Sequence, residues 1–331
     1  MKKYPLFNIN NYTIDTSSFS HMLHDEVEGE LEKEFAEYVG ARYACVANSA
    51  SSLLTLCMMA IRSFGTAIEA NPISIPSMIP LVIPNILYNL DLEWSWKDDV
   101  DWVGSSYVLY DSKKIYENTE GASVESSFKI IDSAQEVRRD QFKEDAERLD
   151  LMVFSLYPTK PVGGMDGGII VSDDKERIDW FRTATHLGVT SSRESSWNRR
   201  LDFPGWKMHP NSSQCYVALN NLRKLDKKNK TLDSIKDRYN SEFGLTNTSR
   251  HLYRIDVEDR DEFQKKIKKF GVDTGIHYNP AHLEKAYDGI KTHRHLEKTQ
   301  NKSKTTVSIP FNEALTDEDV DFVISKIKAN I

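Results

Sequence analysis

The sequence has few cysteines, no long uninterrupted apolar run and no excess of positive charge. Its three cysteines, Cys45, Cys57 and Cys215, are odd in number, show no metal-ligand spacing and lie in apolar or helix-like surroundings. They indicate a reduced, intracellular protein without a metal site. The net charge of -7 gives no reason to expect nucleic acid or an anionic membrane as a partner.

Sequence signals for secretion and for membrane insertion are also lacking. The first residues, M-K-K-Y-P, lead into polar sequence without the apolar core of a signal peptide. The most apolar stretch, Ile73 to Leu90, contains Pro76, Pro80 and Pro84, which argue against a membrane helix. With 39% hydrophobic and 28% charged residues the composition is that of a globular protein, which we expect in the cytoplasm.

Apolar strand-like stretches alternate with helical patterns over residues 1–243. In the first predicted helix, 26–39, Asp25 would be the N-cap and Gly40 would end the helix. The other predicted helices cover 53–61, 84–90, 174–187, 212–225 and 230–243. The predicted strands cover 43–47, 73–76, 92–96, 107–110, 128–132, 151–156 and 168–172. Such alternation indicates an α/β fold with a mostly parallel sheet.

The pattern changes near Gly244. A predicted strand at 252–257 is followed by a helix at 261–270 and a strand at 306–309. A capping box at Thr316 begins a final helix that continues to Ile331. We therefore expect a large domain of residues 1–243 and a smaller α+β domain of residues 244–331.

Lys160 is the first candidate for a chemical role. It ends the run F-S-L-Y-P-T-K at 154–160, directly after a predicted strand and before the glycine-rich run 163–168. A lysine among small residues at the end of a strand is a candidate for a buried amine that forms a Schiff base. The alternative is an ordinary solvated lysine.

Three other features accompany Lys160. The run 48–52, N-S-A-S-S, lies where a strand passes into a helix, so it is either a phosphate-binding helix N-terminus or an ordinary N-cap. Asp132 ends an apolar strand and is either a partner for a protonated ring nitrogen or part of a cap or surface turn. Ser155 is a further candidate phosphate ligand. Together they are the parts that pyridoxal phosphate needs: an amine, a carboxylate for the pyridine nitrogen and a phosphate site.

The order and spacing of these motifs resemble those of the sugar-nucleotide aminotransferases of the DegT/DnrJ/EryC1/StrS group over nearly the whole chain. The resemblance implies a three-layer, fold-type-I pyridoxal-phosphate transferase with a mostly parallel central sheet and a smaller C-terminal α+β domain. The matching motifs are E-L-E-K-E-F-A-E-Y-V-G at 30–40, N-S-A-S-S-L-L at 48–54, D-S-A-Q at 132–135, S-L-Y-P-T-K at 155–160, D-G-G at 166–168, G-W-K-M-H at 205–209 and G-I-H-Y-N-P-A-H at 275–282.

The resemblance also implies roles toward the cofactor. Lys160 would hold pyridoxal phosphate as a Schiff base and later carry a proton between the substrate carbon and the cofactor. Asp132 would pair with the pyridinium nitrogen, and Gln135 would lie near the ring hydroxyl. The phosphate would be held by the backbone N–H groups of Ala50 and Ser51 together with Ser155.

Further roles follow for the substrate side. Members of this family complete each active site across a homodimer interface, which implies that Lys207 from the partner subunit contacts the phosphate or the substrate. His209, His277, Tyr278 and His282 would line the substrate side. Plain packing is the alternative for these residues.

The chain departs from the family pattern in three places. The run 76–80, P-S-M-I-P, has Met78 and Ile79 where the family often has an aromatic residue that stacks on the pyridine ring. The stretch 91–128 is short and lacks the H-x-Y-G segment. Ala50 replaces a glycine of the phosphate loop.

The expected function is therefore transfer of an amino group from glutamate to a keto-sugar nucleotide, in glycan or deoxyaminosugar biosynthesis. One alternative is sugar dehydration with the same cofactor, although family members that dehydrate tend to have histidine at the position of Lys160. The other alternative is a degenerate member that binds the cofactor or a nucleotide sugar without catalysis.

Overall fold

The computed structural model describes residues 2–9, 12, 14–15, 17, 26–61, 73–112, 127–190, 200–290 and 295–331. The chain divides into two compact units. The first, which we call the central-sheet unit, is formed by 11–72 and 106–223. The second, the terminal unit, is formed by 1–10, 73–105 and 224–331. The residues expected in a C-terminal domain, 244–331, thus share a unit with residues 1–10, 73–105 and 224–243, and a domain boundary at 243/244 stays a prediction.

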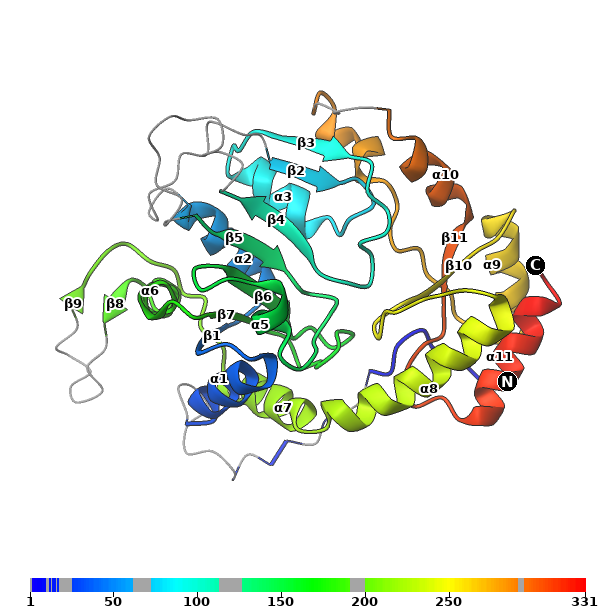
Figure 1. Cartoon of the computed structure of the whole chain (residues 1–331), viewed down its shortest axis with the longest axis horizontal. Coiled ribbons are helices and arrows are strands. Elements are labelled where there is room, and N and C mark those ends of the chain that lie inside the picture. Colours follow the sequence, from blue (N-terminus) through cyan, green and yellow to red (C-terminus); the bar gives the residue numbers. More distant parts are fainter. Residues whose placement is uncertain are drawn as a thin grey trace. The chain divides into compact units, whose positions relative to one another are not determined.

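A five-stranded sheet forms the middle of the central-sheet unit (Figure 1). Only β5 and β6 are parallel neighbours, whereas the other three neighbouring pairs are antiparallel. It follows that β1, β5 and β6 run in one direction and that β4 and β7 run in the other. The strands are, in sheet order, β1 (Tyr43–Ala47), β7 (Gly168–Ser172), β6 (Leu151–Ser155), β5 (Lys129–Asp132) and β4 (Tyr107–Asp111).

Helices pack against this sheet because their apolar residues recur on one face. In the first helix, Leu31 and Phe35 are fully buried, and Gly40 follows the helix with a φ of 79°, a conformation that favours glycine. Helices α1 and α7 lie side by side, α2 packs on β6 and β7, and α6 packs on β1 and β7. The described helices of this unit are α1 (Glu26–Val39), α2 (Ala50–Ala60), α5 (Gln141–Asp145), α6 (Lys175–Thr185) and α7 (Ser212–Leu222). Two short strands, β8 (Val189–Thr190) and β9 (Arg200–Leu201), form an antiparallel pair.

Strand β1 is an edge strand of this sheet, and two side chains bind its outward backbone groups. Glu32 accepts a hydrogen bond of 3.0 Å from the N–H of Val46. Arg182 donates hydrogen bonds to the carbonyl of Ala44, at 2.9 Å, and to Glu32, at 2.7 Å. Because an open sheet edge can pair with another chain, this ion pair protects the edge as well as joining α1 to α6.

The terminal unit contains two small sheets. Strands β10 (Tyr253–Asp256) and β11 (Thr306–Ile309) are antiparallel, and their inner residues Tyr253 and Val307 are fully buried. Strands β2 (Ile73–Pro76) and β3 (Trp94–Lys97) form a parallel pair. The helices of this unit are α3 (Val82–Asn89), α8 (Leu225–Phe243), α9 (Arg260–Lys268), α10 (Glu297–Thr305) and α11 (Asp317–Lys328), with short 3-10 turns η4 (Ala281–Leu283) and η5 (Lys285–Tyr287).

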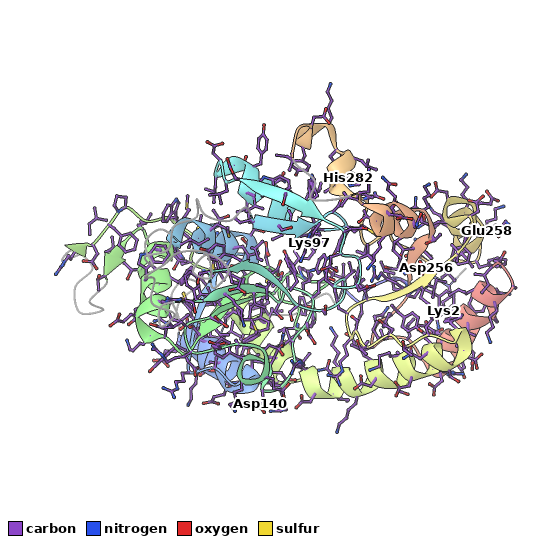
Figure 2. The ribbon with its side chains drawn as sticks, turned by 45° about the horizontal axis from the view of Figure 1, so that its top comes forward. Lys2, Lys97, Asp140, Asp256, Glu258 and His282 are labelled. Atoms are coloured by element: carbon purple, nitrogen blue, oxygen red, sulfur yellow. The ribbon has the colours of Figure 1, made fainter. Side chains whose placement is uncertain are left out.

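The N-terminal segment, residues 2–9, belongs to the terminal unit. Tyr4 donates its N–H to the carbonyl of Gly271 at 2.8 Å, and its ring stacks on Phe322 with centroids 4.7 Å apart. Lys2, which is labelled in Figure 2, forms an ion pair with Asp319 of α11. The sequence, by contrast, suggested that this segment belongs with the large domain.

Most predicted elements are confirmed within a few residues. The observed bounds equal the predicted ones for the helix 26–39 and for the strands 43–47, 73–76, 168–172 and 306–309. Helix α2 begins three residues earlier than predicted and α8 five residues earlier, whereas Asp25, the predicted N-cap, lies outside the described residues. In the described parts of the chain, no helix is long and apolar enough to cross a membrane.

Candidate active site

Lys160 lies in the turn that follows β6. Its backbone N–H bonds to the carbonyl of Tyr157 at 2.9 Å, and Gly163 closes the turn with a φ of 62°. The side chain is half-buried. Burial lowers the pKa of its amine, and the negative charge of Asp132 opposes that shift without cancelling it. The neutral amine, which is the nucleophilic form, is therefore more populated than in a solvated lysine.

Asp132 is the last residue of β5 and is only 7% exposed, so it does not belong to a surface turn. Its Oδ1 accepts a hydrogen bond of 2.9 Å from the N–H of Ala134. Burial raises the pKa of this carboxyl group, and the Ala134 N–H, the Lys160 amine and the Tyr107 hydroxyl oppose the rise. The carboxyl group thus lies in a dehydrated place where an added cation would be attracted strongly.

Tyr107 is a functional candidate that the sequence did not reveal. It is the first residue of β4 and the direct neighbour of Asp132 in the antiparallel pairing of β4 with β5. Its hydroxyl donates a hydrogen bond of 3.1 Å to Asp132 Oδ2. The expectation of a mostly parallel sheet concealed this neighbour, because a parallel β4 would begin at the opposite edge of the sheet.

The run 48–52 proves to be both a helix cap and a set of backbone donors. Ser49 is the N-cap of α2, and its Oγ accepts the N–H of Ser52 at 3.1 Å. By position, the N–H groups of Ala50 and Ser51 have no carbonyl of the same helix to bond. These two groups point out of the positive end of the helix, where an anion is favoured.

Gly168 explains part of the D-G-G motif by sterics. A Cβ atom at this position would lie 2.3 Å from the backbone nitrogen of Ala50 and 2.6 Å from the carbonyl carbon of Ser49. Real Cβ atoms do not approach backbone so closely, so only glycine lets β7 pass beside the first turn of α2. The glycine therefore sets the position of the candidate phosphate site.

These residues converge on one edge of the five-stranded sheet, which we call the site edge. Strands β1, β5 and β6 end there, at Ala47, Asp132 and Ser155, and β4 and β7 begin there, at Tyr107 and Gly168. The register links them, because Gly168 faces both Ala47 and Ser155, and Tyr107 faces Asp132. Polar groups at the carboxyl ends of parallel strands are the usual place for a ligand in an α/β sheet.

The other predicted cofactor residues of this unit are placed as follows. Ser155 is buried, and its Oγ accepts the N–H of Tyr157 at 3.3 Å. Gln135, three residues after Asp132, is also buried. Lys207 is exposed, and the adjacent Met208 accepts the N–H of Asn48 at 2.7 Å, which holds this segment against the phosphate loop.

The ring of His209, which we predicted to line the substrate side, stacks on that of His186, with centroids 5.0 Å apart. Its Nδ1 lies 3.1 Å from the carbonyl oxygen of Pro210. The contacts of His209 thus include packing, the alternative that the sequence left open.

The three predicted substrate residues near residue 280 lie in the terminal unit. His277 Nδ1 is 2.8 Å from Ser308 Oγ, and the Tyr278 ring lies nearly parallel to that of Trp102, with centroids 6.3 Å apart. His282, which is labelled in Figure 2, lies on η4, and its Nδ1 is 2.6 Å from the hydroxyl of buried Ser77. Burial lowers the pKa of His282.

Comparison with known families identifies the chain. Residues 132–328 match the model of the DegT/DnrJ/EryC1/StrS aminotransferase family. The chain belongs to this family. The matched range includes Asp132, Lys160 and Gly168 of the site edge.

Relatives of this family match the chain along nearly its whole length. A UDP-4-amino-4,6-dideoxy-N-acetyl-beta-L-altrosamine transaminase of Campylobacter jejuni is 24% identical over 363 residues, which cover 98% of this chain and 96% of the relative. The spore coat polysaccharide biosynthesis protein SpsC of Bacillus subtilis is 24% identical and covers 90% of this chain and 88% of its own. A Streptococcus pneumoniae structure in its PMP form is 18% identical, with a TM-score of 0.80 and 98% coverage of both chains, and the same protein has been solved in a PLP form.

For a DegT/DnrJ/EryC1/StrS aminotransferase, the predicted fold class, activity class and cofactor, pyridoxal phosphate, are confirmed by these comparisons. The residues at the site edge fit this cofactor. Within the described part of the chain, the hydrogen-bond donors to buried Asp132 are neutral groups, so the carboxylate can still accept a cationic ring nitrogen. The half-buried amine of Lys160 and the donors at the start of α2 complete the set.

Proposed function

We propose that this protein transfers an amino group from glutamate to a nucleotide-linked keto sugar, in the biosynthesis of a glycan or a deoxyaminosugar. One observation supports this proposal: the Asp132 carboxylate and the first turn of α2 lie together at the site edge. The turn that contains Lys160 is next to them. The names of the Campylobacter and Bacillus relatives support the substrate class, because they refer to an amino sugar nucleotide and to a polysaccharide.

In this proposal Lys160 has two tasks. Its amine would hold the cofactor through the cofactor's aldehyde group, and once released it would carry the proton that leaves the amine-bearing carbon of the substrate. Both tasks need a neutral amine, which burial of Lys160 favours. When bound, pyridoxal phosphate supplies an electron sink for the substrate carbon.

The other residues of the central-sheet unit bind and orient the cofactor. Asp132 accepts the ring N–H, and its charge keeps that nitrogen protonated. Gln135 lies near the ring hydroxyl. The phosphate is held by Ser155 and by the N–H groups of Ala50 and Ser51, where the helix dipole favours an anion.

The substrate side is completed by residues from two subunits of a homodimer in the cytoplasm. Lys207 of the partner subunit contacts the phosphate or the substrate, which its exposure supports. His209, His277, Tyr278 and His282 line the path of the sugar. Their hydrogen bonds and ring contacts within one chain fix their orientation, as a binding site requires.

The test uses the spectrum of the purified full-length protein with pyridoxal phosphate. Wild type is expected to show the visible absorption band of a lysine-bound cofactor, and Lys160→Ala to show none. Lys175→Ala is the matched control, because Lys175 is an exposed lysine, paired with Asp179 at 2.5 Å, on α6. A band of equal strength in wild type and Lys160→Ala would disprove the role of Lys160.

Addition of glutamate then separates the remaining functions. A transaminase converts its bound cofactor to the amine form, so the visible band of wild type is expected to disappear. A band that persists with glutamate would favour a dehydratase or a binding member without catalysis. Formation of a dehydrated sugar product by the holoenzyme would then separate the dehydratase from the binding member.

A further inference from the structure

A tyrosine outside the family motifs touches the most buried carboxylate of the site edge. We propose that Tyr107 is a positioning residue, whose hydroxyl holds the Asp132 carboxylate in the orientation and charge state that can pair with the ring nitrogen of the cofactor. The inference rests on the proposed role of Asp132. It adds a residue that neither the sequence motifs nor the comparisons identify.

The contact between the two side chains is built into the sheet. Tyr107 and Asp132 are direct partners in the register of β4 with β5, and each is 7% exposed. The hydroxyl reaches Asp132 Oδ2 at 3.1 Å. The preceding residue, Ser106, donates both its N–H and its hydroxyl to Glu136 at 3.2 Å, so the start of β4 is tied to the turn after β5.

The two oxygens of Asp132 are held by different donors. The Ala134 N–H binds Oδ1, and the Tyr107 hydroxyl binds Oδ2. These two bonds fix the plane of the carboxylate. Each carboxylate oxygen has a second lone pair, so the group can accept a ring N–H while both bonds persist. Tyr107 therefore supports the cofactor contact and does not compete with it.

The hydroxyl also affects the charge of Asp132. Burial raises the pKa of this carboxyl group, which favours the neutral acid, whereas the Tyr107 hydroxyl lowers it. Among the described residues, the other ionisable groups that interact with Asp132 are Lys160, after β6, and the buried thiol of Cys57, on α2, whose pKa Asp132 raises further. Without the hydroxyl, the carboxyl group would hold the proton for a larger fraction of the time, and the ring nitrogen for a smaller fraction.

The antiparallel direction of β4 is what brings this tyrosine to Asp132. The N-terminal end of an antiparallel neighbour lies beside the C-terminal end of β5, which is the site edge. A parallel neighbour would present its C-terminal end instead. In this chain the shortened stretch 91–128 thus contributes a residue to the site.

The decisive experiment is a pH titration of the visible band of the holoenzyme, with Tyr107→Phe compared with wild type. A proton on the ring nitrogen disfavours a second proton on the lysine-bound nitrogen, because like charges repel. If Tyr107→Phe weakens the ring protonation, the pH midpoint of the band should rise by about one unit. The rate constant kcat should fall about tenfold, as for one hydrogen bond to a charged group, with KM changed less than about twofold.

Two variants frame this measurement. Tyr110→Phe removes a hydroxyl from the same strand, at a residue that faces Ile130 in the register, and its midpoint should equal that of wild type. Asp132→Asn removes the carboxylate itself and should shift the midpoint further than Tyr107→Phe. If Asp132→Asn shifts the midpoint and Tyr107→Phe does not, the inference is wrong and the proposed function stands.

A second substitution keeps the test independent of folding. A ring-fluorinated tyrosine at position 107 is a stronger donor, so the midpoint should move in the opposite direction from that of Tyr107→Phe. If the pH midpoint shifts by the same amount and in the same direction in the fluorotyrosine variant and in Tyr107→Phe, the inference is wrong, because a packing defect would then explain both shifts. If wild type binds no cofactor, or Lys160→Ala keeps the band, the proposed function and this inference both fail.

Discussion

Two carboxyl groups of the central-sheet unit, half-buried Glu32 and buried Asp132, are both largely removed from water but differ in their partners. Burial raises the pKa of both groups. Glu32 faces a cation, since Arg182 binds its Oε2 at 2.7 Å and the Val46 N–H binds its Oε1. Both donors to Asp132 in the described residues are neutral. Glu32 thus has its cationic hydrogen-bond partner within the chain, whereas Asp132 can still accept a hydrogen bond from a cation of a bound ligand.

This difference separates a carboxylate that stabilises the fold, Glu32, from one with a proposed role in catalysis, Asp132. The Glu32–Arg182 pair covers the edge strand β1 and joins two helices, so its loss should affect stability. Asp132 lies at the end of β5 with a carboxylate that burial destabilises. Loss of the Asp132 carboxylate should affect the reaction rate, because buried groups with perturbed pKa values are concentrated at functional sites.

Asp132→Asn should give the largest effect. The rate of amino transfer from glutamate is expected to fall on the order of 10³-fold, because the amide cannot keep the ring nitrogen charged. The free energy of unfolding of the protein without cofactor should stay equal or increase. Stopped-flow loss of the visible band and urea unfolding measure the two quantities. An active but unstable Asp132→Asn protein would reverse the comparison.

Glu32→Gln should show the opposite pattern. Loss of the charged partner of Arg182 is expected to lower the free energy of unfolding by about 1.5 kcal/mol, a reduced value because the Arg182 side chain is 44% exposed. The rate per folded active site should remain that of wild type. Urea unfolding, together with activity normalised to bound cofactor, gives both numbers. A stable but inactive variant would contradict the structural role of Glu32.

A smaller effect is expected in the pH dependence of stability. Because the folded-state pKa of Asp132 is raised, the folded protein holds this proton at a pH where the unfolded chain has lost it. Wild type without cofactor should therefore lose stability, relative to Asp132→Asn, as the pH rises from the usual carboxyl pKa through the raised value. Urea unfolding at several pH values from 4 to 8 tests the sign. A constant difference between the two proteins would show that burial does not perturb Asp132.

Glu34→Gln should give the smallest effect and serves as the control for Glu32. Glu34 lies on the same helix, α1, and forms an ion pair with Arg223 in which both side chains are partly exposed. The loss of stability should be about 0.5 kcal/mol, because solvent screens such pairs. If Glu34→Gln and Glu32→Gln cost the same in urea unfolding, burial is not what separates the two pairs.

The sequence supported part of the site because several of its residues lie in continuous motifs. Asp132 ends a predicted strand, and Lys160 and the run 48–52 each follow one, so their placement at strand ends could be inferred from local pattern alone. The motif at 166–168 also includes Gly168, but the sequence did not show why glycine is needed there. Glycine is needed because of a contact between segments more than 100 residues apart.

Other features depend on pairing, which local periodicity does not encode. Tyr107 reaches Asp132 only because β4 is antiparallel to β5, and nothing in the run 107–110 specifies the direction of its neighbour. The grouping of residues 73–105 with the C-terminal residues is likewise a property of tertiary contacts. Helix α10 was missed because, in Glu297–Thr305, only Thr299 is buried, so it lacks an apolar stripe.

The close approach of Gly168 to Ala50 has a consequence for variation of this protein. Position 168 tolerates no side chain unless the first turn of α2 moves, even though Gly168 itself takes no part in the chemistry. In a library of random variants, substitutions at 168 should therefore be depleted as strongly as those at Lys160, and conservative changes should fare no better than radical ones. A position that has no room for a side chain can therefore indicate a functional site even though its own residue has no chemical role.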